Sequence, residues 1–414
     1  MKRIIALFIV ICFIFTRTIP VKAGTNEQDL LPEIHGEAAI LIDVKSGQIL
    51  FNKNSDKQLA PASTTKIMTG LLAIESGKLQ ETVTTTQTML DYKTVYGTRI
   101  YLEPGETLLM SDLLYALLLN SANDSAVAIA EHISGSVKDF AELMNRRAKE
   151  LGALNTNFVN PSGLTESGHY TTANDLALIA RAAYQNPVFA EYVRTKKHTI
   201  PRVKAGVPSE MVNENKLLWR DESVTGIKTG YTMAAGNCLV ASASKDGREL
   251  IGVILKSPGK EIYTDMLDLF QYGFSNYDTT IYMDANSSVG TMSVNDQEIN
   301  LLLASPIWIT KKQDALTPEL QFNVVKPEAP LTTTEVGQIV ARLEVRYDEK
   351  LLNIIPLKAD RTILMRQNHS RPSFITSYGL VALLGVILLL LGCIKVLFRK
   401  KYYMRSYARR ESNQ

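Results

Sequence analysis

The sequence has few of the residues that cross-link small folds or bind metal ions. Its 414 residues include three cysteines, and Cys12 and Cys393 lie in apolar runs near the two ends. Cys238 is alone between those runs, so an internal disulfide is excluded there and a region of roughly 350 residues must rest on its hydrophobic core. The five histidines are scattered without metal-ligand spacing. We therefore expect neither a metal site nor any other cofactor.

An excess of positive charge is also missing from most of the chain. The formal net charge is +3, but four basic residues fall in the first 23 positions and seven in the last 20. Residues 24–394 contain 34 basic and 41 acidic residues, a net charge of about −7. The sequence therefore offers no basic face for nucleic acid, and we expect no nucleic-acid partner.

The two ends carry targeting segments. Lys2 and Arg3 precede an apolar run, and small residues near Ala23 offer a cleavage site, so residues 1–23 are predicted to be a signal peptide. A retained N-terminal anchor is the alternative. Residues 374–394 have no charge and are rich in Leu, Val and Ile, and about 20 such residues span a bilayer. A buried helix of a globular domain is the alternative here, although such helices rarely lack a polar face.

The last 20 residues set the expected orientation. Residues 395–414 contain seven basic residues and one acidic residue. Positive charge stays on the cytoplasmic side of a membrane. The sequence therefore predicts a single-pass protein of the cell membrane, with a large extracytoplasmic part, one transmembrane helix and a short basic cytoplasmic tail.

Residues 26–276 are predicted to form one α+β domain, an antiparallel sheet with helices packed on it. Apolar residues at helical spacing predict helices in its middle, at residues 64–75, 111–120, 126–133, 140–151 and 172–183. Strands are predicted on both sides of these helices, at residues 39–43, 48–51, 225–229, 238–244 and 249–255.

The character of the chain changes in residues 279–368, where no long helical pattern occurs. Short strands separated by turn residues are predicted at residues 281–283, 299–303, 307–310, 320–325, 340–347 and 351–357. We expect a small β-rich domain that acts as a spacer between the first domain and the membrane.

Three short motifs together point to acyl transfer through a serine. They are Ser-Thr-Thr-Lys at residues 63–66, Ser-Ala-Asn at residues 121–123 and Lys-Thr-Gly at residues 228–230. They supply a nucleophile with an amine nearby, a polar pair, and a cationic strand edge. Ser63 and Lys66 lie one turn apart on the same face of the predicted helix, so the amine and the hydroxyl can meet.

Other matches to these short patterns lie in unsuitable places. Ser242 and Ser257 also precede a lysine by three residues, but Ser242 falls in a strand-like run and Ser257 is followed by Pro-Gly. Ser-Val-Asn at residues 293–295 fits the second pattern, and Lys-Ser-Gly at residues 45–47 is typical of a hairpin turn. One set of motifs is therefore placed for joint chemistry.

The three motifs and their surroundings resemble the penicillin-recognising serine D-alanyl-D-alanine carboxypeptidases, the low-molecular-mass penicillin-binding proteins (peptidase S11). The similar stretches cover nearly the whole exported region and include residues 61–69, 157–164, 168–173, 226–232 and 336–357. The resemblance implies a transpeptidase/β-lactamase-like catalytic fold. It also implies removal of the terminal D-alanine from peptidoglycan stem pentapeptides through an acyl-enzyme, in cell-wall synthesis, with inhibition by β-lactams.

The same resemblance implies three catalytic residues. Ser63 would attack the carbonyl between the last two D-alanines, and Ser121 would pass a proton to the departing D-alanine. Lys66 would be the base, although which group takes the proton is disputed for these enzymes. A free amine needs a pKa well below about 10.4, which burial and repulsion by Lys228 would provide.

Five further residues are implied in substrate binding. Asn123 would hold the substrate amide, and Lys228 and Thr229 would face the terminal carboxylate. Gly230 would let the strand edge approach closely. The oxyanion would lie between the backbone N–H groups of the nucleophile and Tyr231.

Some positions depart from the family pattern or remain open. Tyr231 stands where many members carry histidine, but only its N–H is needed. Glu214 stands where a basic residue is expected, which leaves recognition of the carboxylate open; Arg248 is a candidate replacement, with an exposed strand charge as the alternative. His169 and Asp175 are predicted to be structural, as part of a hydrogen-bonded loop and as a helix-terminal acid.

Three other functions can be compared with this one. A class A β-lactamase needs a glutamate that activates water, and Glu166 is not followed by the Leu-Asn pair of that class. A non-hydrolytic β-lactam sensor would need an inner domain, for which the twenty residues after Ile394 leave no room. A non-catalytic wall-binding protein would not need every polar catalytic position filled. The sequence therefore favours the carboxypeptidase.

Overall fold

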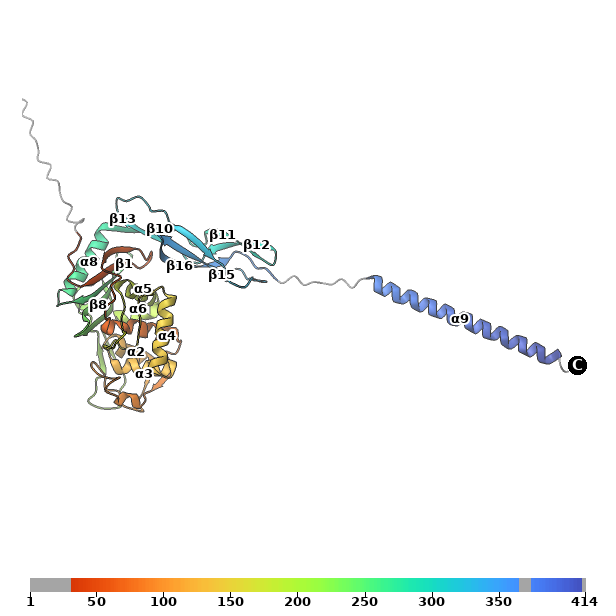
Figure 1. Ribbon diagram of the computed structural model, residues 1–414, viewed down its shortest axis with the longest axis horizontal. Coiled ribbons are helices and arrows are strands. Elements are labelled where there is room, and N and C mark those ends of the chain that lie inside the picture. Colours follow the sequence, from red (N-terminus) through yellow and green to blue (C-terminus); the bar gives the residue numbers. More distant parts are fainter. Residues whose placement is uncertain (1–30, 365–373, 412–414) are drawn as a thin grey trace, which may run out of the picture.

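A five-stranded antiparallel sheet forms the centre of the N-terminal part of the protein. The computed structural model describes residues 31–364 and 374–411, so the predicted signal peptide at residues 1–23 lies outside the described residues. The strand order is β2-β1-β9-β8-β7, and β1 and β8 of this sheet are labelled in Figure 1. These strands are β1 (Ala38–Asp43), β2 (Ile49–Lys53), β7 (Val224–Thr232), β8 (Gly236–Lys245) and β9 (Arg248–Ser257).

Both faces of this sheet are buried, because alternate side chains of each strand enter different cores. In β1, Ala38, Ile40 and Ile42 pack in the larger core, whereas Ala39 and Leu41 pack in the smaller one. An antiparallel sheet with one solvated face would alternate apolar and polar residues instead. This burial explains why the central strands are almost continuously apolar.

Six helices pack together on one side of the sheet, with α5 and α6 in contact with its strands. They are α1 (Lys66–Glu75), α2 (Met110–Leu118), α3 (Asn123–Ser134), α4 (Val137–Glu150), α5 (Ala173–Tyr184) and α6 (Pro187–Arg194). α1 contacts all the others and is buried along its whole length apart from Glu75. The position of its N-terminus is therefore fixed from every side.

α8 (Ile262–Asn276) covers the opposite face of the sheet and is absent from the predicted elements. It lies close to the strands, because a Cβ at Gly252 would lie 2.4 Å from Met266 Sδ. α6 is also absent from the predicted elements. The predicted helices and strands of this part are present, with ends that shift by at most three residues.

Shorter elements complete the first part of the chain. The pairs β3–β4 and β5–β6 form two small antiparallel sheets. The elements are η2 (Ala62–Thr65), β3 (Thr82–Thr84), η3 (Gln87–Leu90), β4 (Thr107–Leu109), β5 (Lys197–Thr199), β6 (Glu210–Val212) and α7 (Leu217–Arg220).

The chain continues from α8 into a β-rich part with its own core. It contains a two-stranded sheet, β10-β13, and a five-stranded sheet of order β11-β12-β16-β15-β14. The predicted strands are present here, and β11 is an additional one. The strands are β10 (Tyr277–Met283), β11 (Ser288–Val294), β12 (Gln297–Leu303), β13 (Ile307–Lys312), β14 (Gln321–Val325), β15 (Ile339–Tyr347) and β16 (Lys350–Ala359).

A buried arginine connects the two parts. Arg181 of α5 donates hydrogen bonds to the carbonyl oxygens of Val44, Lys45 and Leu352, at 2.7, 3.1 and 3.0 Å. The first two carbonyls belong to the turn after β1, and Leu352 belongs to β16. Burial lowers the pKa of Arg181 to about 10, so it is charged at neutral pH. The β-rich part is therefore held against the helical side of the first sheet.

The last described element is α9 (Phe374–Glu411). Within it, Gly379–Lys401 has the length and composition of a membrane span, and an 18-residue stretch of it has a mean hydropathy of 2.9. This segment overlaps the predicted span at residues 374–394.

Candidate active site

Ser63 and Lys66 meet at the N-terminus of the central helix. The one-turn helix η2 runs directly into α1, which places the two side chains on the same side. Lys66 Nζ lies 2.9 Å from Ser63 Oγ. Ser63 is partly exposed, whereas Lys66 is fully buried. The hydroxyl can therefore reach a ligand while the amine cannot.

The other contacts of Lys66 define which way its hydrogens point. Its Nζ donates to Asn123 Oδ1 and to the carbonyl oxygen of Ser162, both at 2.7 Å. The amide orientation of Asn123 is fixed, because its Nδ2 donates to the carbonyl oxygen of Tyr96 at 2.5 Å. Both partners of Lys66 can only accept. A neutral amine would thus use its two N–H groups on them and direct its lone pair at Ser63.

The environment of Lys66 favours this neutral form. Burial lowers its pKa well below the ordinary lysine value, and the nearby charge of Lys228 lowers it further. Glu214 and Asp124 act in the opposite direction, but they do not cancel the effect of burial. A lower pKa increases the fraction of the amine that is neutral and so able to accept the proton of a serine hydroxyl.

Ser121 and Asn123 come from the connection between α2 and α3. Ser121 is nearly buried, and its φ of 61° lies in the left-handed region that a non-glycine residue rarely adopts. The N–H of Asn123 donates to the carbonyl oxygen of Thr98 at 2.8 Å and so fixes the start of α3. Such strained backbone is common at functional sites.

Strand β7 brings the third motif against the nucleophile. A Cβ at Gly230 would lie 2.8 Å from the backbone nitrogen of Ser63, so only glycine fits at this point. Lys228 is 1% exposed, and its ammonium donates to the carbonyl oxygen of Thr229 at 3.3 Å. Burial lowers the pKa of Lys228. Tyr231, the residue after the glycine, is 64% exposed at the edge of the cleft.

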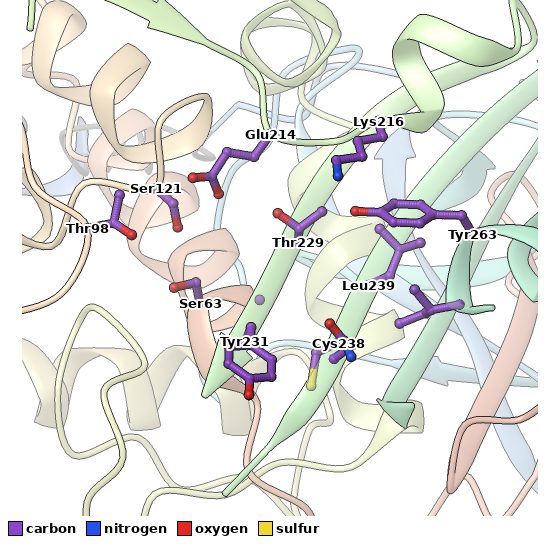
Figure 2. A pocket seen from close by; sticks show the side chains of 13 residues that line it. Ser63, Thr98, Ser121, Glu214, Lys216, Thr229, Tyr231, Cys238, Leu239 and Tyr263 are labelled. Atoms are coloured by element: carbon purple, nitrogen blue, oxygen red, sulfur yellow. The ribbon is translucent and has the colours of Figure 1, made fainter. Parts of the chain in front are cut away.

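A cleft of roughly 450 Å³ opens beside Ser63. Figure 2 shows Ser63, Ser121 and Thr229 around one space. A second hollow of roughly 420 Å³ lies on the other side of the serine and includes Leu164 and Met233. The structure thus brings the eight predicted site residues together: Ser63, Lys66, Ser121, Asn123, Lys228, Thr229, Gly230 and Tyr231.

This geometry agrees with the comparison to known protein families. A family model described as D-alanyl-D-alanine carboxypeptidase (Peptidase_S11) matches residues 23–259. The chain belongs to this family. It is similar to D-alanyl-D-alanine carboxypeptidase DacF of Bacillus subtilis, with 33% identity over 85% of this chain and 90% of the relative. DacC of Escherichia coli is 31% identical over 79% of this chain and 84% of its own length.

Solved structures extend the similarity to both parts of this carboxypeptidase. Penicillin binding protein 5 from Haemophilus influenzae aligns with a TM-score of 0.62 and 28% identity, over 80% of this chain and 98% of that chain. The Streptomyces K15 DD-transpeptidase aligns with a TM-score of 0.55 and 30% identity, over 59% of this chain and all of its own. The fold is therefore the penicillin-binding DD-peptidase fold, with a further C-terminal sheet region.

Arg248 does not replace the missing cation of the carboxypeptidase cleft. Its guanidinium donates to the carbonyl oxygens of Phe274, at 2.6 Å, and of Tyr277, at the end of α8. It is only partly exposed, so it is not a free strand charge either. Both interpretations of this residue are wrong, because the arginine satisfies carbonyl groups that the end of a helix leaves unpaired.

His169 and Asp175 have structural partners. The N–H of Val159 donates to His169 Nδ1 at 3.1 Å, so the other ring nitrogen, Nε2, carries the proton and donates to Thr65 Oγ1 at 2.9 Å. Burial lowers the pKa of His169 to about 4. Asp175 accepts from the N–H of Asn155 at 2.7 Å. These contacts agree with the structural interpretation of both residues.

The motifs did not indicate every residue at the site. The carbonyl oxygens of Ser162 and Tyr96 position Lys66 and Asn123, but a backbone carbonyl leaves no mark in a sequence. Lys216 and Tyr263 line the cleft and belong to no motif. Among the residues that the structure describes, no group of three or more His, Cys, Asp and Glu is placed to hold a metal ion.

Proposed function

We propose that Ser63 is the nucleophile with which this serine-type carboxypeptidase removes the terminal D-alanine of peptidoglycan stem peptides. The observation that carries this assignment is the set of contacts around Lys66. Two obligate acceptors take its N–H groups, so the lone pair of the neutral amine remains for the Ser63 hydroxyl. The hydroxyl proton would pass to Lys66 as the oxygen attacks the carbonyl carbon of the substrate.

In the acylation step, one bond forms at the carbonyl carbon of the substrate and one bond breaks there. The Ser63 Oγ–carbon bond forms, the peptide C–N bond breaks, and Ser121 relays the proton that Lys66 took from Ser63 to the nitrogen of the departing D-alanine. The N–H groups of Ser63 and Tyr231 would stabilise the negative oxygen of the tetrahedral intermediate. Water subsequently hydrolyses the ester, which releases the shortened stem peptide and restores the serine.

The remaining motif residues bind the substrate. Asn123 would hold the substrate amide, and the hydroxyl of Thr229 would face the terminal carboxylate. Lys228 lies beneath the surface of the cleft, where Glu214 partly offsets its positive charge. Gly230 allows β7 to pass close to the serine. A β-lactam would acylate Ser63 by the same route, with its ring amide in place of the peptide.

A β-lactamase function receives no comparable support. Glu166, the acid considered for that role, accepts a hydrogen bond from Asn160 at 3.2 Å. Among the described residues, it lines neither of the two hollows that contain Ser63. A water positioned by Glu166 is therefore not placed to attack an ester at the serine.

The same proposal assigns a place to each part of the chain. Residues 26–276 form the catalytic domain, and residues 279–368 form the small β-rich domain that separates it from the membrane. Residues 374–394 cross the cell membrane, and residues 395–414 are the basic cytoplasmic tail. The catalytic domain would then act outside the cytoplasm, where peptidoglycan is found, after removal of residues 1–23.

The test is to incubate the purified protein with a stem peptide that ends in D-alanyl-D-alanine and to measure free D-alanine by mass spectrometry. We expect release by the native protein and none by Ser63→Ala. A fluorescent penicillin should label the native protein but not the variant, and the label should be lost slowly. Absence of D-alanine release with stable labelling would indicate a sensor, and rapid label loss would indicate a β-lactamase.

A further inference from the structure

The end of the cleft that receives the departing residue has an unexpected charge arrangement. Glu214 lines this end, and its Oε2 lies 3.9 Å from Lys228 Nζ. Lys228 is buried, whereas the side chain of Glu214 is 43% exposed. A ligand in the cleft would therefore meet the carboxylate of Glu214 before the ammonium beneath it. The negative charge offsets that of Lys228 and would repel a substrate carboxylate.

Another cation is needed at this end, and Lys216 supplies it. Of the residues that line this cleft in the described part of the chain, Lys216 alone carries a positive charge. Arg248 is engaged by the end of α8 and is not in the cleft. The structure records no hydrogen bond or ion pair for the ammonium of Lys216 within residues 31–364, so it remains available to a ligand.

The surroundings of Lys216 fit a carboxylate. Figure 2 shows the ammonium of Lys216 and the hydroxyl of Tyr263 close to each other on one side of Thr229, whose own hydroxyl points toward Glu214 and Ser63. Two donors from two elements, the N-terminus of α7 and the first turn of α8, thus face one space beside strand β7. Tyr263 is held in place by the guanidinium of Arg220, which lies 5.5 Å from the ring centre.

We propose that Lys216, together with the hydroxyl of Tyr263, binds the terminal carboxylate of the departing D-amino acid beside Thr229. This assignment rests on the proposed carboxypeptidase function and names the residue that selects a free C-terminus. Because Glu214 pairs with Lys228, no uncompensated cation other than Lys216 remains on the described lining of this cleft. Binding of the carboxylate there therefore requires Lys216.

The contact can be measured with two substrates that differ only at the carboxylate. One is a blocked L-lysyl-D-alanyl-D-alanine peptide, and the other is its C-terminal carboxamide. A charge-assisted contact at a partly exposed site changes affinity by roughly ten-fold or more. We expect the native protein to prefer the acid by roughly this factor in kcat/KM. Lys216→Gln should lose most of that preference, through a higher KM for the acid, with little change for the amide.

Two further variants complete the experiment. Lys216→Arg should keep the preference for the acid, because it keeps the charge. Lys245→Gln removes an exposed lysine at the far end of β8 and should have the kcat/KM values of the native protein on both substrates. The thermal unfolding midpoints of Lys245→Gln and Lys216→Gln should both equal that of the native protein. An unchanged acid preference in Lys216→Gln, or an equal loss on both substrates, would overturn the assignment. If the native protein released D-alanine from neither substrate, the proposed function would fail instead, and the assignment with it.

Discussion

The charges around Lys66 and Lys228 determine the pH at which the site can work. Lys66 must lose its proton to act as the base, so activity should rise with pH through the pKa of Lys66. Lys228 acts as a cation, so activity should fall as pH rises through the pKa of Lys228. Glu214 raises the pKa of both lysines. Burial is the largest influence on both pKa values, but this one carboxylate acts on both limbs of the pH profile in the same direction.

Replacing this carboxylate should move the whole profile. In Glu214→Gln, both lysines lose an attractive charge, both pKa values fall, and both limbs of kcat/KM against pH shift to lower pH by up to roughly one unit. D-alanine release from the stem peptide between pH 5 and 10 measures this. Glu222→Gln makes the same change in net charge at an exposed position and should leave the profile in place. A shift to higher pH would contradict the role given to Glu214.

Gly230 tests the close approach of β7 to the nucleophile. In Gly230→Ala, the new Cβ would lie 2.8 Å from the nitrogen of Ser63, so the strand or the serine must move. We expect the rate of acylation by a fluorescent penicillin to fall by roughly ten- to a hundred-fold, because one donor of the oxyanion site is displaced. Gly247→Ala is the control: its φ of +75° also strains the backbone, but no atom lies within 4 Å of the new Cβ and the turn between β8 and β9 does not line the cleft. Equal labelling rates in the two variants would show that the site tolerates the side chain.

At the scale of elements, the sequence predicted those whose apolar pattern is strong and local. Helix α1 and strands β8 and β9 have long apolar runs at regular spacing and were found with small shifts at their ends. β11 was missed, because its Ser, Gly and Thr residues do not mark a strand and its pairing with β12 is what stabilises it. α8 was missed, because its aromatic and glycine residues make a helix that only packing on the sheet explains.

At the site, too, the sequence predicted what depends on local spacing and missed what depends on tertiary packing. The motif residues were predicted from their spacing, since Ser63 and Lys66 are brought together by one local helix. The convergence of the three motifs was implied by the resemblance to a family, and no local rule brings β7 to α1. Lys216 and the carbonyl of Ser162 lie at the site through tertiary packing alone. Such residues can be found only from the folded structure.

The loop before α5 makes stability depend on pH through His169. The pKa of His169 falls from 6.5 to about 4 on folding, so between these values the unfolded chain binds a proton that the folded chain does not. The contribution of neutral His169 to the free energy of unfolding is therefore fully present above pH 6.5. It decreases as pH falls, by about 2 kcal/mol at pH 5. Urea unfolding at pH 7.5 and pH 5 measures the change.

Two variants isolate this contribution. His169→Gln is expected to be less stable at pH 7.5 because it loses the hydrogen bonds of the ring to Thr65 and Val159, but its stability should change less between the two pH values than that of the native protein. His132→Gln removes a histidine that pairs with Glu81 at the surface and should keep the native pH dependence. If His169→Gln lost stability on acidification as steeply as the native protein, a different group would be responsible.

At the scale of the whole molecule, the length and apolar composition of α9 suggest a membrane anchor for the catalytic part. The 23 residues of Gly379–Lys401 rise by about 35 Å as a helix, which exceeds the hydrocarbon core of about 30 Å and allows some tilt. None of that apolar segment is buried in the protein. A helix that exposes this much apolar surface needs another apolar environment, and a bilayer matches its length.

Removal of this helix should therefore change location without changing chemistry. We expect the full chain to sediment with membranes and to resist extraction by high salt, and a chain that ends at residue 364 to be soluble. Its kcat/KM on a soluble stem peptide should stay within about two-fold of the detergent-solubilised full chain, because α9 provides no residue that lines the cleft. Leu389→Arg places a charge near the middle of the span, at a cost of about 3 kcal/mol, and should weaken membrane retention. Release of the full chain by salt alone would mean that α9 lies on a surface instead of crossing the bilayer.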